Sequence, residues 1–85
     1  MVEHHGQFLL IETKLPGVVI PEGQRILFDH LVSDDRWRVL IIWGHPGLPE
    51  HIQLWGHNTI ATDLIRVKRI ISRWYRYAHR IGFHI

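Results

Sequence analysis

The stretch Phe8–Gly17 reads FLLIETKLPG, and it decides how the chain is organised. An apolar run ends in a glutamate, one spacer and a lysine, and a Pro-Gly pair then breaks the chain. Side chains alternate along a strand, so Glu12 and Lys14 share one face while Ile11 and Thr13 share the other. Two interpretations follow. The pair is either a solvated strand end with a weak ion pair, or a carboxylate and an ammonium placed together for catalysis.

The residues before this stretch predict a β-hairpin. Val2–Glu3 and Phe8–Thr13 flank a short polar segment in which Gly6 can take a positive φ. With the tip at residues 5–6, the numbers of paired residues add to eleven. The position opposite Glu12 therefore falls two places before Met1.

The residues after it predict a helix and two strands. Pro21 suits the first residue of a helix at about residues 21–32. Trp37–Trp43 is nearly all apolar, as in a strand covered on both faces, and His51–Trp55 alternates like a half-buried strand. The predicted apolar face of the helix consists of Ile26, Leu27, Phe28 and Leu31.

A long amphipathic helix is predicted at about residues 59–81, capped by Asn58 or Thr59. Its apolar stripe, which suits a core or a dimer interface, repeats at spacings of four and three. The stripe consists of Ile60, Leu64, Val67, Ile71, Trp74, Ala78 and Ile81. The opposite line consists of Arg66, Arg69, Arg73, Arg76 and Arg80.

The charge of this helix indicates a polyanionic partner. Residues 59–85 hold six basic side chains against one acidic, a net charge of +5, whereas residues 1–58 hold four against seven, a net charge of −3. Arginine forms bidentate contacts with phosphate, and Tyr75 and Tyr77 beside it are suited to stacking on bases. DNA, duplex or branched, is the favoured partner; a solvated helix face and an acidic protein surface are the alternatives.

Composition narrows the class of protein. Eighty-five residues suit one small domain, and the absence of cysteine excludes disulfides and thiolate metal sites. The N-terminus lacks the features of a signal peptide, and the longest apolar run, Val39–Trp43, is far too short to span a membrane. We therefore expect a cytoplasmic protein without membrane contact. The fold class predicted from the element order is mixed α+β.

Part of this pattern resembles a known nuclease family. Glu12-Thr13-Lys14, Pro16-Gly17, Gln24 and the strand Val39–Trp43 together are similar to the VRR-NUC branch of the PD-(D/E)XK nuclease superfamily. The resemblance covers residues 8–44. It implies a small restriction-endonuclease-like core, ordered as β-hairpin, helix, two strands and long C-terminal helix. It also implies a Mg²⁺ or Mn²⁺ cofactor, with Glu12 as metal ligand, Lys14 as catalytic amine and Gln24 as polar helper.

The sequence departs from the family at one essential point. The family's metal-binding aspartate lies on the preceding strand, about a dozen residues before the glutamate, and residues 1–11 contain no aspartate. Glu3, opposite Phe8, would share the right face but lie about 13 Å along the strand from the required position. We therefore expect it to be a poor substitute for the second carboxylate. The family's first helix is absent as well.

The histidines predict no metal site. His4 and His5 are read as turn residues, and adjacent histidines on a strand would point apart. His45, His51 and His57 lie near strand ends, and their spacing does not match that of zinc ligands.

Two functional hypotheses result. The first is a small, homodimeric, metal-dependent DNA endonuclease, encoded by a phage or prophage and acting on branched DNA in the bacterial host. The second is a catalytically inactive protein of the same fold, which binds nucleic acid or a host protein and so blocks a host defence complex.

Overall fold

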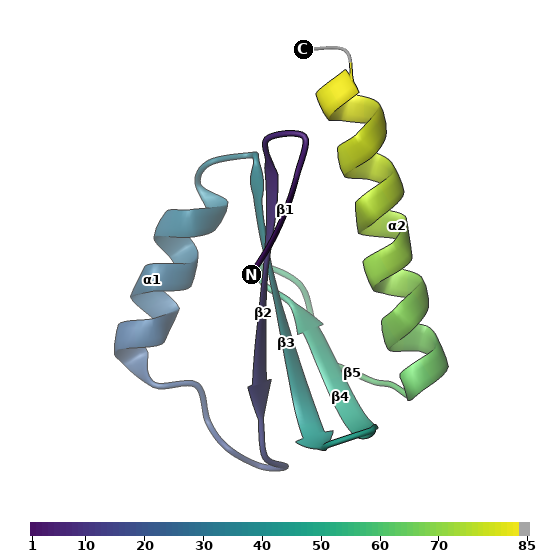
Figure 1. Cartoon of the computed structure of the whole chain (residues 1–85). Coiled ribbons are helices and arrows are strands. Elements are labelled where there is room, and N and C mark those ends of the chain that lie inside the picture. Colours follow the sequence, from purple (N-terminus) through teal and green to yellow (C-terminus); the bar gives the residue numbers. More distant parts are fainter. Residues whose placement is uncertain (84–85) are drawn as a thin grey trace.

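The computed structural model describes residues 1–83, with the side chains of residues 1–81. It has three layers, with a five-stranded sheet between the helices α1 and α2 (Figure 1). This confirms the mixed α+β class and the predicted long C-terminal helix. The elements are β1 (Val2–His4), β2 (Gln7–Lys14), α1 (Glu22–Val32), β3 (Trp37–His45), β4 (Leu48–Leu54), β5 (Ile60–Ala61) and α2 (Leu64–Phe83).

The strands follow one another across the sheet in chain order. β2 and β3 are parallel and connected through α1, and every other neighbouring pair is antiparallel. β1 pairs with β2 as Val2↔Leu9, Glu3↔Phe8 and His4↔Gln7, which is the predicted register. The two tip residues, His5 and Gly6, have φ values of 52° and 77°, as a tight two-residue hairpin turn requires.

Each face of the sheet has its own apolar core. Leu40 of β3 points to the face covered by α2, together with Leu9 and Ile52, and packs against Val67, Trp74 and Ala78. Val39 and Ile41 point to the other face, where they pack with Ile20 and Phe28. All three β3 residues are at most 1% exposed, so the prediction of a strand covered on both faces is confirmed.

The apolar face predicted for α1 is partly wrong. Ile26 and Leu27 are 53% and 50% exposed, whereas Phe28 is 1% exposed and lies in the core. At 100° per residue, Gln24, Phe28 and Leu31 lie on the side that faces the sheet and Ile26 lies opposite. Pro21 precedes the helix with an extended backbone rather than forming its first helical residue.

α2 begins four to five residues later than predicted. Its cap is Asp63, whose side-chain Oδ1 accepts a hydrogen bond of 2.8 Å from the Arg66 N–H, and not Asn58 or Thr59. Ile60 belongs instead to β5 and pairs with Ile52 of β4. Its spacing of four from Leu64 matches the helical stripe by coincidence, which is why the helical pattern hides this short strand.

The β3–β4 hairpin is longer than expected. Both strands extend to the turn at Pro46-Gly47, so β4 begins at Leu48 rather than at His51. Among the described residues, neither helix has the length and hydropathy that crossing a bilayer would need.

Candidate functional site

Glu12, Lys14 and Gln24 come together on the face of the sheet covered by α1. The first two project from the end of β2, and Gln24 projects from the first turns of α1. The Glu12 Oε1 atom accepts a long hydrogen bond of 3.5 Å from the Gln24 Nε2 atom and lies 3.8 Å from the Lys14 Nζ atom. The three residues singled out by the sequence therefore form one cluster, called here the Glu12 cluster.

The Glu12 cluster is partly withdrawn from water. The Lys14 side chain is only 10% exposed, and the Glu12 side chain is 32% exposed. The Oε1 atom of Gln24 is buried and accepts no hydrogen bond from the described residues. Buried polar atoms normally have a partner, so this oxygen is an acceptor suited to water or a cation.

The connection between β2 and α1 is held against the sheet. The indole N–H of Trp43 donates a hydrogen bond of 2.7 Å to the carbonyl oxygen of Val18. Ile20 is 5% exposed within the core, and its carbonyl oxygen accepts a hydrogen bond of 3.3 Å from Arg25 Nε. These contacts fix the start of α1, and hence Gln24, beside the end of β2.

The oxygen donors of the cluster fit a hard divalent cation only in part. Glu12 offers a carboxylate and Gln24 an amide oxygen. Mg²⁺ is commonly held by one or two carboxylates together with water and substrate phosphate. Among the described residues no group of three or more potential metal ligands includes Glu12. Glu3 accepts a hydrogen bond of 2.9 Å from the Gly6 N–H in the hairpin, so it does not replace the missing carboxylate.

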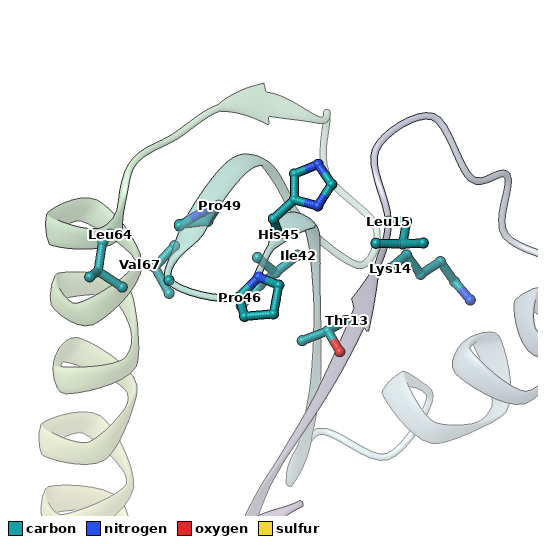
Figure 2. A pocket seen from close by; sticks show the side chains of 11 residues that line it. Thr13, Lys14, Leu15, Ile42, His45, Pro46, Pro49, Leu64 and Val67 are labelled. Carbon is teal, nitrogen blue, oxygen red and sulfur yellow. The ribbon is translucent and has the colours of Figure 1, made fainter.

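A pocket lies at the same end of the sheet but on the other side (Figure 2). Thr13, Ile42 and Val67 line it together with the β3–β4 turn, and the lining is mainly apolar. The Lys14 side chain extends toward α1, away from Leu64 and Val67 (Figure 2). Lys14 nevertheless belongs to the lining, so the pocket adjoins the Glu12 cluster at the end of β2.

The arginines of α2 form an exposed basic surface. Arg66, Arg69, Arg73, Arg76 and Arg80, called here the arginine surface, are all exposed. The salt bridges among the described residues are Lys14–Glu12 and Arg36–Asp34, so no carboxylate in that part of the chain forms a salt bridge with these arginines. Three of them form a hollow with Tyr77: Arg73, Arg76 and Arg80.

Arg38 extends the arginine surface, although nothing in the sequence pattern assigns it there. Its guanidinium lies 5.9 Å from the centre of the Tyr77 ring, in a cation–π contact. It lies at the start of β3, and only the packing of α2 on the sheet brings it to Arg73 and Tyr77. Tyr75, in contrast, lies on the other flank of α2, where its ring stacks on that of His4 at 4.1 Å.

The structure does not bring the arginine surface to the Glu12 cluster. α2 covers the face that carries Leu9 and Leu40, whereas Glu12 points to the face covered by α1 (Figure 1). The sheet therefore lies between the cluster and the helix that carries the arginines.

A second cluster consists of His4, His5 and His79. Their potential ligand nitrogens all lie within 4.8 Å of one another. The pKa of His4 is below its usual value, first because the ring loses contact with water and then because positive charge on His5 and His79 would repel its own. His5 lies in the turn, as predicted, whereas His4 is the last residue of β1. The rule that adjacent strand histidines point apart therefore does not apply, and the two ring centres lie 4.1 Å apart.

Comparisons with known proteins were made for the whole chain. No family model matches it, and neither does any curated protein or solved structure.

Proposed function

We propose that this protein binds nucleic acid and hydrolyses phosphodiester bonds at the Glu12 cluster with Mg²⁺ or Mn²⁺. The observation that carries the proposal is the convergence of Glu12, Lys14 and Gln24, with 3.5 and 3.8 Å between their functional atoms. These are the residues that the resemblance to VRR-NUC nucleases assigns to the site. The buried, unpartnered oxygen of Gln24 supports a site that is completed by a ligand.

Each residue has a distinct task in this proposal. Glu12 and Gln24 would hold the metal through oxygen atoms, and substrate phosphate and water would complete its coordination. The metal supplies Lewis acidity and a nucleophilic water at neutral pH. The Lys14 ammonium orients that water and offsets the negative charge that develops on the phosphate. Its low exposure strengthens this effect, because water screens the charge less.

A cleavage assay tests the proposal. Supercoiled plasmid, linear duplex and four-way junction DNA would be incubated with Mg²⁺, Mn²⁺ or EDTA. We expect nicking that requires the divalent ion and falls at least 100-fold in Glu12→Gln and in Lys14→Met, while DNA binding is retained. Glu50→Gln, which removes an exposed carboxylate from β4, is the matched control and should retain full activity.

The proposal of cleavage fails if no divalent-dependent nicking occurs, or if nicking survives both substitutions. Contaminating nuclease is recognised because its activity would be identical in the wild type and in all variants.

The second candidate function is binding without cleavage. It is favoured by the single carboxylate of the Glu12 cluster and by the position of the arginine surface on the opposite side of the sheet. The partner would be nucleic acid or the acidic surface of another protein. This function predicts metal-independent binding and no hydrolysis, and a steep dependence of affinity on salt would identify nucleic acid as the partner.

A further inference from the structure

Three imidazoles meet where the β1–β2 turn lies against α2. His4 ends β1, His5 forms the turn, and His79 lies in the last turns of α2. The Nε2 atom of His4 is 3.2 Å from the Nδ1 atom of His79. One nitrogen from each of the three rings lies within 4.8 Å of the other two.

The backbone and one aromatic contact hold this arrangement. His5 has a φ of 52°, and this left-handed conformation turns its ring toward its neighbour, with 4.1 Å between the His4 and His5 ring centres. The His4 ring also stacks on Tyr75 at 4.1 Å and 18°. Tyr75 and His79 are four residues apart on the same flank of α2. The helix therefore both packs against the His4 ring, through Tyr75, and provides His79.

We propose that His4, His5 and His79 bind one divalent transition-metal ion of the Zn²⁺ type. In a tetrahedral zinc site the Zn–N distance is about 2.05 Å, which places ligand nitrogens about 3.3 Å apart. The His4–His79 pair already has this spacing. The two other pairs both include His5 and must close by at most about 1.5 Å, a movement that rotation of the exposed His5 ring provides.

The donor atoms determine the class of metal. Imidazole suits Zn²⁺, Cu²⁺ and Ni²⁺, whereas Mg²⁺ requires oxygen donors. The site is therefore chemically distinct from the Glu12 cluster, and neither proposal depends on the other. Three protein ligands leave a fourth position to water. Because the ion would join the hairpin to α2, metal binding would stabilise the folded chain.

Zinc titration tests this site. The full chain, stripped with EDTA, would be titrated with Zn²⁺ against a chromophoric chelator, and its thermal unfolding followed with Zn²⁺ or Mg²⁺. We expect one Zn²⁺ per chain with micromolar or tighter affinity, a rise in melting temperature with Zn²⁺ and no rise with Mg²⁺. His79→Gln and His5→Asn should each weaken binding at least 10-fold. Asparagine is chosen at position 5 because it tolerates a positive φ.

The chain provides a matched control in another exposed histidine, His45, at the end of β3. His45→Gln should leave zinc affinity and stoichiometry unchanged. The site is refuted if no Zn²⁺ binds at micromolar concentration, if His79→Gln and His5→Asn both retain wild-type affinity, or if His45→Gln weakens binding as much as they do. Circular dichroism of each metal-free variant verifies that it is folded.

Discussion

Lys14 has an ammonium group in a side chain that is only 10% exposed, and the neighbouring Glu12 carboxylate compensates for this burial. The separation of 3.8 Å is long for an ion pair, so the carboxylate provides charge rather than a strong hydrogen bond. Gln24 completes the arrangement by donating to the same oxygen. Removing one member of this group therefore affects the other two.

Glu12→Ala leaves the Lys14 ammonium without its counter-charge. We expect the free energy of unfolding to fall by about 1–2 kcal/mol. Adding Lys14→Met removes the unpaired charge and should recover at least half of that loss. Urea unfolding of the two single variants and the double variant measures the coupling. Additive losses would show that the two groups do not interact.

Asp34 gives a separate expectation about acid stability. The Arg36 guanidinium, which donates to both carboxylate oxygens, lowers the pKa of Asp34 from 3.8 to about 2. Because the folded pKa is below the unfolded value, this stabilisation is complete above pH 4 and is lost as the pH falls toward 2. Asp34→Asn should flatten the dependence of stability on pH between pH 4 and 2, as urea unfolding at several pH values would show. An unchanged slope would contradict this assignment.

At the scale of secondary-structure elements, turn and cap chemistry determine where each element begins. The hairpin register follows from a two-residue turn, so it was predictable from local sequence. The start of α2 was not predictable in this way, because Ile60 continues the helical spacing although it pairs with β4. The choice between Asp63 and earlier caps depends on that tertiary pairing.

Asp63→Ala tests the observed cap of α2. Loss of the hydrogen bond to the Arg66 N–H should lower the free energy of unfolding by about 1 kcal/mol. Thr59→Ala, at one of the two positions that the sequence pattern favours as caps, should change it by less than about 0.5 kcal/mol. Thermal and urea unfolding of both variants provides the measurement. Equal effects would refute the assignment of the cap.

The hairpin register also predicts where a second carboxylate would complete the Glu12 cluster. Continuing the pairing places the residue opposite Glu12 two positions before Met1. Directly paired residues have Cβ atoms about 5 Å apart, close enough to share one metal ion. A chain extended at its N-terminus with aspartate at that position should cleave DNA with Mg²⁺ at least 10-fold faster than one with asparagine there. Equal rates would contradict this placement.

At the scale of the whole molecule, the sheet separates the Glu12 cluster from the arginine surface. Helical spacing predicted the line of arginines, and the family resemblance singled out Glu12, Lys14 and Gln24. Neither predicted their separation, because a helical period does not specify which face of a sheet the helix will cover. The histidine cluster also depends on tertiary packing, since His79 meets His4 only because α2 packs against the hairpin. Arg38 likewise reaches Tyr77 only in the folded chain. The pairing of distant elements is therefore the part that the sequence did not reveal.

This separation predicts that binding and cleavage respond to different substitutions. The triple variant Arg69→Gln, Arg73→Gln and Arg76→Gln should bind DNA at least 30-fold more weakly at low salt. The slope of log affinity against log salt should decrease by about one for each phosphate group that the variant no longer neutralises. Fluorescence anisotropy at several salt concentrations measures both effects.

Lys68→Gln is the matched control for this experiment, since it removes a cation from the other flank of the same helix. We expect it to change the slope by less than half of the average change per arginine in the triple variant. An effect equal to that of an arginine variant would point to diffuse attraction by net charge rather than to a defined surface.

The short strand β1 leaves part of one edge of β2 unpaired among the described residues. β1 pairs only with residues 7–9 of β2. Residues 10–14 of β2 pair with β3 on one side, and on the other side they have no strand partner among the described residues. Free sheet edges accept added strands, and this one runs beside Glu12 and Lys14. A separate peptide could therefore complement the fold in trans, and catalysis would then report on the peptide's binding. A strand added there in trans would lie beside the Glu12 cluster, where the proposed chemistry would take place.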